Sequence, residues 1–130
     1  MGLNEKRKLK ELQDVTLPER QKELAEICGT EIKYEVDWDS LASDLEALNF
    51  FDNLSCHRIN MAFRALCIDR LAKDAIKESL KTIKLKNVKD KSDVKIAFKN
   101  GVLEMQVAYA LRTEGMLNDT EIKNVVAEGL

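Results

Sequence analysis

The chain has 130 residues, enough for one domain with a sizeable core, and its 45% hydrophobic and 34% charged residues are typical of a soluble globular protein. Its first ten residues are charged, and no uncharged apolar run approaches the roughly 18 residues that a membrane span needs, so we expect neither a secretory signal nor a span. The net charge is −2, and the three dispersed cysteines fit reduced thiols of a cytoplasmic protein better than a disulfide framework.

Two helices are predicted at the start of the chain. Leucine and valine residues recur among dense charges over residues 1–15 and indicate a short amphipathic helix, frayed at its beginning. Thr16 and, three residues later, Glu19 form a capping box that begins a second helix. Gly29 ends that helix because glycine readily adopts a positive φ.

A strand and a further helix follow. Residues 31–36 alternate apolar and charged side chains, which is the pattern of a half-buried strand. Asp37 or Asp39 can cap the next helix, which carries leucines at helical spacing. Residues 49–54 then form the joint to a central helix.

The central helix is expected to begin at Asn53 and to continue to Lys81. It is apolar on most sides as far as Ile68 and on one broad face after that. Such a helix should lie in the middle of the core. One polar stripe crosses its first half at spacings of i, i+4, i+7 and i+11, and it consists of Asn53, His57, Asn60 and Arg64.

A β-hairpin is predicted over residues 94–107. Asn100-Gly101 is the dipeptide that a type I′ turn prefers, since both positions need a positive φ. Pairing outward from this turn joins Phe98 to Leu103 and places the apolar side chains of both strands on one face. The turn chemistry and the hydrophobic pattern therefore select the same register.

A strand at residues 83–88 precedes the hairpin, and a helix capped by Asn118 follows it. The order of elements is helix, helix, strand, two helices, three strands and helix. This order predicts an α+β fold. We expect one small domain over residues 1–130, in which a long central helix and other helices pack on one face of an antiparallel sheet of three to four strands.

Charge is distributed unevenly along the chain. Residues 31–52 carry seven acidic side chains against one lysine, whereas residues 53–99 carry twelve basic side chains against five acids. Both sets fit solvated faces of the fold. They also fit two surfaces that meet different partners, or each other in a homodimer.

The polar stripe is the first candidate for a site. His57 is a candidate catalytic acid or base because an unperturbed imidazole exchanges its proton close to neutral pH, and Asn53 and Arg64 could bind its substrate. The same four side chains suit a small polar or anionic ligand or a partner helix, with Arg64 holding a carboxylate while Asn60 and His57 orient it. The alternative is that His57 closes a buried hydrogen bond or faces water.

Cys56 is a weaker catalytic candidate. At the third position of a helix that Asn53 caps, the helix dipole would favour its thiolate. Cys56 and His57 do not form a dyad, because adjacent residues of a helix diverge by about 100°. The alternative for Cys56 is a small buried side chain.

Nucleic-acid binding is a third option, through a basic row between Lys73 and Lys91. Its members are Lys73, Lys77, Lys81, Lys84, Lys86, Lys89 and Lys91. Such a row can bind phosphates, but this stretch lacks aromatic residues for base stacking, and the chain as a whole is acidic. No spacing typical of a metal site or of a cofactor-binding loop is found, so we expect neither group.

The hypothesis from sequence is a cytoplasmic, non-enzymatic binding or interaction module. We expect a protein partner or self-association as a homodimer, with a polar or anionic ligand as a further partner on the central helix. The alternative is a small enzyme or ligand sensor that uses His57 and Arg64.

Overall fold

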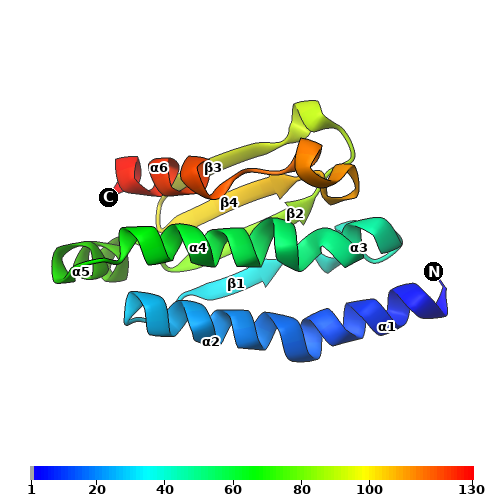
Figure 1. The fold of residues 1–130 in the computed structure, drawn as a ribbon, viewed down its shortest axis with the longest axis horizontal. Helices are drawn as coiled ribbons and strands as arrows, with labels where there is room; N and C mark the ends of the chain where they lie inside the picture. Colours follow the sequence, from blue (N-terminus) through cyan, green and yellow to red (C-terminus); the bar gives the residue numbers. More distant parts are fainter. Residues whose placement is uncertain (1) are drawn as a thin grey trace.

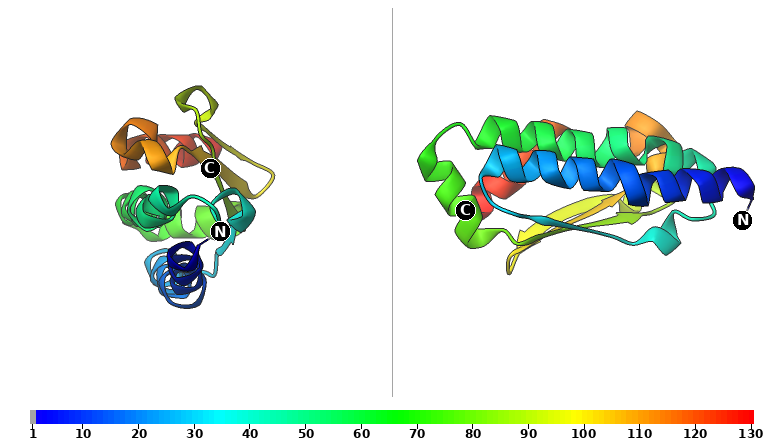
Figure 2. Two further views of the ribbon diagram at one scale, coloured as in Figure 1. Left: turned by 90° about the vertical axis from the view of Figure 1, so that its right-hand side faces the viewer. Right: turned by 90° about the horizontal axis from the view of Figure 1, so that it is seen from below.

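The computed structural model describes residues 2–130 and shows one four-stranded sheet with helices on one of its faces (Figures 1 and 2). The predicted α+β fold is confirmed. The helices are α1 (Leu3–Glu11), α2 (Leu17–Cys28), α3 (Leu45–Phe51), α4 (His57–Leu66), α5 (Arg70–Ser79) and α6 (Asp119–Gly129). The strands are β1 (Lys33–Val36), β2 (Thr82–Asn87), β3 (Lys95–Lys99) and β4 (Val102–Val107).

The sheet is mixed, so the prediction of an antiparallel sheet is wrong in this respect. Its strand order is β1-β2-β4-β3. The first three of these strands are parallel, and only β3 and β4 are antiparallel. The chain passes from β1 to β2 through α3, α4 and α5, a long helical crossover that parallel strands require. After β2 the chain continues to β3 at the far edge of the sheet, and β4 then lies between β3 and β2.

The hairpin has the predicted turn and register. Asn100 and Gly101 both have positive φ, at 54° and 79°. Phe98 pairs with Leu103, and Ile96 with Met105. Positive φ at both central positions matches the right-handed twist of the two strands, which is why this turn fixes their register.

The helix at the amino terminus has no break at Thr16, so the predicted capping box is wrong. Thr16 is helical and makes no side-chain capping bond. A π-helical turn at Leu12–Thr16 joins α1 to α2 instead. Pro18 lies two residues after this turn. Proline lacks an N–H and its ring crowds the carbonyl four residues earlier, and the widened turn accommodates it. Gly29 ends α2 with a φ of 70°, as predicted.

The helix boundaries around α4 also differ from the prediction. Asp37 caps only a short 3₁₀ turn, and Asp44 caps α3 through the N–H of Ala47. Residues 49–54 are not a joint, because α3 continues into α4 through a π-helical turn at Asp52–Cys56. The expected single helix to Lys81 is broken after Leu66. Asp69 caps α5 there by accepting the N–H of Ala72 at 2.9 Å.

The core lies between the sheet and the helices. In β2, Ile83 and Leu85 are buried against the helices, while Lys84 and Lys86 are exposed on the opposite face. Figure 2 shows that no helix covers this second face. Within residues 2–130, none of the helices combines the length and the apolar character that crossing a bilayer requires.

Candidate functional site

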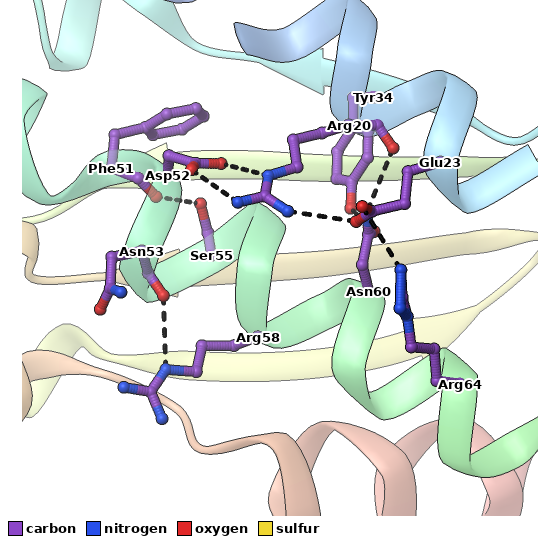
Figure 3. A network of polar contacts seen from close by, with 10 residues as sticks. All are labelled: Arg20, Glu23, Tyr34, Phe51, Asp52, Asn53, Ser55, Arg58, Asn60 and Arg64. Atoms are coloured by element: carbon purple, nitrogen blue, oxygen red, sulfur yellow. Dashed lines mark hydrogen bonds and ion pairs between the residues drawn. The ribbon is translucent and has the colours of Figure 1, made fainter. Parts of the chain in front are cut away.

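The polar stripe of α4 faces α2 and β1, and Asn60 is its buried centre. Asn60 is 1% exposed. Its Nδ2 donates to the carbonyl oxygen of Arg20 at 3.1 Å and to Oε1 of Glu23 at 2.7 Å. Its Oδ1 accepts a hydrogen bond from the hydroxyl of Tyr34 at 2.8 Å. The amide therefore joins α2, α4 and β1, as Figure 3 shows.

Arg20 is the cation at the centre of this network. Its Nε and Nη2 donate to the two carboxylate oxygens of Asp52, each at 2.9 Å, and its Nη1 donates to Glu23 at 3.1 Å (Figure 3). The hydrogen bonds to Asp52, more than any other cause, raise the pKa of Arg20 above its ordinary value. This paired contact attaches α2 to the π-helical turn that precedes α4.

The carboxylate of Glu23 is contacted by three donor side chains. Asn60 and Arg20 donate to its Oε1, and Nη2 of Arg64 lies 3.3 Å from its Oε2. The hydrogen bond from Asn60 is the largest cause that lowers the pKa of Glu23, and Arg20 and Arg64 add to it. Burial acts in the opposite direction, but Glu23 stays ionised well below neutral pH.

The structure brings together three of the four predicted stripe residues. His57, Asn60 and Arg64 border a hollow of about 130 Å³, together with Arg20, Glu23 and Met61. Asn53 is exposed and is not part of this border. Its backbone carbonyl accepts a hydrogen bond from Nε of Arg58 at 3.3 Å.

The stripe hollow has little charge to offer a ligand. Arg20 and Arg64 are balanced by Glu23 and Asp52, and their donors are largely used within the protein. Among the hydrogen bonds of residues 2–130, none joins the His57 ring to a carboxylate that would orient it for catalysis. The network accounts for helix packing better than for recognition.

Sequence reasoning placed Asn60 and Arg64 on the correct face but missed Arg20, Glu23 and Asp52. Arg20 and Glu23 are three residues apart on α2, so they share a face, and this spacing was an available signal. Nothing in the local pattern shows that this face packs against α4.

Cys56 lies in the core. Burial, as the largest cause, raises its pKa to about 12, so the side chain is a neutral thiol near pH 7. An activated nucleophile needs the opposite shift.

A second and larger hollow lies where α5 meets the end of α2. It measures about 310 Å³, and we call it the basic hollow. Its lining residues are Cys28, Gly29, Arg70, Lys73, Asp74 and Lys77. Nε of Arg70 lies 3.4 Å from Asp74. Lys73 and Lys77 make no ion pair with any carboxylate in the described part of the chain.

The carboxyl end of α2 explains part of the gathering of cations in the basic hollow. The last turn of α2 contains no basic residue, although the carbonyl groups at a helix carboxyl end carry partial negative charge. The cations of α5 lie beside this end and complement it. They still exceed the acidic groups of the basic hollow, whose lining has three cationic side chains and one carboxylate.

The predicted lysine row divides between two surfaces. Lys73 and Lys77 line the basic hollow, and Nζ of Lys81 donates to the carbonyl oxygen of Lys77 at 2.6 Å. Lys84 and Lys86 border a different hollow of about 340 Å³ on the uncovered sheet face, with Glu35 and Glu104. Phosphate contacts along one continuous line are therefore not available to the whole row.

No group of three or more metal-ligating side chains gathers within residues 2–130. Comparisons of the chain with protein-family models, curated proteins and solved structures found no match.

Proposed function

We propose that this protein is a non-enzymatic binding module and that the basic hollow receives a small anionic ligand. One observation carries the proposal: Arg70, Lys73 and Lys77 converge on a single hollow in which Asp74 is the only carboxylate of the lining. Charge-assisted hydrogen bonds from such groups are the strong interactions that carboxylates and phosphates form with proteins.

Size also favours the basic hollow over the stripe on α4. Pockets for small molecules are commonly about 300 Å³ or larger. The basic hollow, at about 310 Å³, reaches this range, whereas the stripe hollow measures about 130 Å³. Lys73 and Lys77 are free to pair with an incoming anion, while Arg64 already contacts Glu23.

A catalytic role for His57 and Arg64 is the alternative. It is supported by their position beside one hollow, with Asn60 between them along α4. It requires a substrate small enough for that hollow, and the carboxylate of such a substrate would compete with Glu23 for Arg64. Binding of a protein partner, self-association and weak nucleic-acid binding stay predictions from the charge pattern.

Calorimetric titration tests the proposal with inorganic phosphate, pyrophosphate and citrate as probes. We expect pyrophosphate or citrate to bind the unmodified protein, and Lys73→Gln or Lys77→Gln to weaken this binding roughly tenfold, equivalent to about 1.4 kcal/mol. Lys22→Gln removes an exposed lysine of α2 that lines neither hollow, and it should leave the affinity unchanged. Higher salt should weaken the binding.

Two results would reject this proposal. One is the absence of heat from all three probes at low ionic strength. The other is an affinity that falls in Arg64→Gln but not in Lys73→Gln, which would move the ligand to the stripe hollow.

A further inference from the structure

Two cysteines that are distant in the sequence lie side by side at the ends of two helices. Cys28 is the last residue of α2, and Cys67 follows the last residue of α4. Their sulfur atoms are 3.5 Å apart although the residues are separated by 39 positions. At this distance the S–H of one thiol donates to the sulfur of the other. Both are free thiols in this structure.

The two thiols differ in exposure and in charge. Cys28 is 1% exposed, whereas Cys67 is only partly buried. The hydrogen bond with Cys28, and after it the positive charge of Lys73, lowers the pKa of Cys67. The same hydrogen bond, together with burial, raises the pKa of Cys28. Cys67 is therefore the thiol that ionises and reaches solvent, and Cys28 is the buried neighbour that stays protonated.

The backbone around both residues permits a closer approach. A disulfide requires an S–S distance of about 2.0 Å, so the two sulfurs must move together by roughly 1.5 Å. Gly29 follows Cys28 with a positive φ, and a Cβ at this position would have no heavy atom within 4 Å. Cys67 is the residue at which α4 ends: its N–H still donates to the carbonyl oxygen of Phe63 at 2.8 Å, but its φ of −85° and ψ of 49° are not helical.

We propose that Cys67 and Cys28 form a peroxide-reactive dithiol, which hydroperoxides oxidise to an intramolecular disulfide. The Cys67 thiolate attacks one peroxide oxygen, so that an S–O bond forms, the O–O bond breaks and an alkoxide or hydroxide leaves and takes up a proton. Cys28 then attacks the sulfenic sulfur of Cys67, the S–S bond forms, the S–O bond breaks, and the hydroxide that leaves takes the proton of Cys28 as water. Two thiols and one hydroperoxide thus give one disulfide, one alcohol or water from the peroxide, and one further water.

Cys56 serves as a reference inside the same molecule. It is fully buried, and its pKa is raised to about 12, so it should not react on the same time scale. Cys28 and Lys73 also line the basic hollow, but the peroxide reaction is measured without an added anion, so its outcome does not depend on the proposed function.

The experiment treats the reduced full-length chain with one equivalent of hydrogen peroxide, then denatures it and alkylates it with N-ethylmaleimide. We expect the oxidised protein to take up one maleimide, at Cys56, where the reduced protein takes up three. Peptide mapping should identify the Cys28–Cys67 crosslink within single chains. Uptake of three maleimides after peroxide treatment, a crosslink that includes Cys56, or a disulfide between two chains would overturn the inference.

Variants test the order of the two steps. Cys28→Ser should stop the reaction at a sulfenic acid on Cys67, which dimedone traps, and Cys67→Ser should leave the remaining thiols unoxidised. Lys73→Gln should slow the loss of thiol several-fold, whereas Lys22→Gln should not change its rate. Equal rates for these two lysine variants, or dimedone labelling of Cys28 in place of Cys67, would contradict the assignment of Cys67 as the attacking thiol.

Discussion

The hydroxyl of Tyr34 donates to Oδ1 of Asn60 at 2.8 Å, and both side chains are buried. Tyr34 is on the edge strand β1, and Asn60 is in the middle of α4. Asn60 also donates to the carbonyl oxygen of Arg20, so one side chain satisfies polar groups of a strand and of a second helix. A buried polar group without a partner costs about 1–3 kcal/mol, which gives this single amide a large effect on stability.

Replacing Asn60 by Ala should lower the free energy of unfolding by about 2–4 kcal/mol, because the buried Tyr34 hydroxyl loses its acceptor and Glu23 loses its shortest hydrogen bond. Thermal unfolding checks this, with an expected fall of roughly 4 °C in Tm for each kcal/mol. Asn53→Ala is the matched control, since Asn53 belongs to the same stripe but is exposed. Equal unfolding temperatures for the two variants would show that Asn60 has no structural role.

The lowered pKa of Glu23 predicts a dependence of stability on pH. Its folded pKa is below the ordinary value of 4.5, so the unfolded chain binds the proton more readily. The carboxylate therefore stabilises the fold above about pH 4.5, and this contribution is lost as the pH falls through the folded pKa. Unfolding by urea between pH 7 and pH 3 should show Glu23→Gln less stable than the unmodified protein at pH 7, with the difference shrinking below pH 4.5.

Glu26→Gln controls for the loss of one negative charge, because Glu26 is an exposed residue of α2 outside the network. A difference between Glu23→Gln and the unmodified protein that stays constant over the whole pH range would exclude the linkage.

Gly115 should not tolerate a side chain. Its carbonyl accepts the N–H of Ala108 at 2.9 Å, and a Cβ at Gly115 would run into the carbonyl oxygen and the side chain of Ala108. We expect Gly115→Ala to destabilise the protein by about 1–3 kcal/mol, as overpacking does. Gly29→Ala meets no atom within 4 Å and carries only the cost of its positive φ, about 1 kcal/mol. Chemical denaturation distinguishes the two, and a smaller effect at Gly115 than at Gly29 would contradict the packing.

Oxidation of the dithiol should stabilise the fold. A disulfide between Cys28 and Cys67 closes a loop of 39 positions, which lowers the entropy of the unfolded chain by the equivalent of about 4 kcal/mol if no strain opposes it. Calorimetry of the oxidised and the reduced protein should show Tm higher by on the order of 10 °C after oxidation. An unchanged Tm would mean that strain in the folded state offsets this gain.

Arg64 and His57 should matter little for stability. The ion pair of Arg64 with Glu23 involves side chains that are 53% and 33% exposed, and such pairs contribute about 0–1 kcal/mol. Separate replacements by Ala should therefore lower Tm by only a few degrees and leave pyrophosphate binding intact. Loss of ligand binding in His57→Ala with unchanged Tm would instead support the alternative site on α4.

The elements that the sequence predicted correctly depend on neighbouring residues. The hairpin follows from Asn100-Gly101 and its flanking pattern, and Asn118 caps α6 by accepting the N–H of Glu121 at 2.8 Å. The parallel pairing of β2 with both β1 and β4 depends on residues far apart in the chain, and periodicity carries no information about it. The prediction at Thr16 was wrong for a different reason. The capping pattern indicated that a new helix begins there, but the widened turn before Pro18 lets the first helix continue into α2 without interruption.

In the candidate sites, too, the sequence predicted what depends on local spacing and missed what depends on distant segments. Helical spacing was sufficient to place His57, Asn60 and Arg64 on one face of α4. The side chains that pair with Asn60 and Arg64 are Glu23 and Tyr34, which come from other segments of the chain. The spacing on α4 therefore could not show that these polar groups already have partners. The contact between Cys28 and Cys67 depends on the packing of two helix ends and was likewise beyond local reasoning.

The position of β2 constrains the way in which the chain reaches its native state. This strand pairs with β1 from the first third of the chain and with β4 from the last third. A ribosome-bound fragment that ends before Val102 therefore leaves one long side of β2 without a partner. Among the strand pairs, only the hairpin joins residues close in sequence. The other two pairs form only after long loops have closed. We therefore expect folding to be slow for a domain of this size and to be completed only after synthesis.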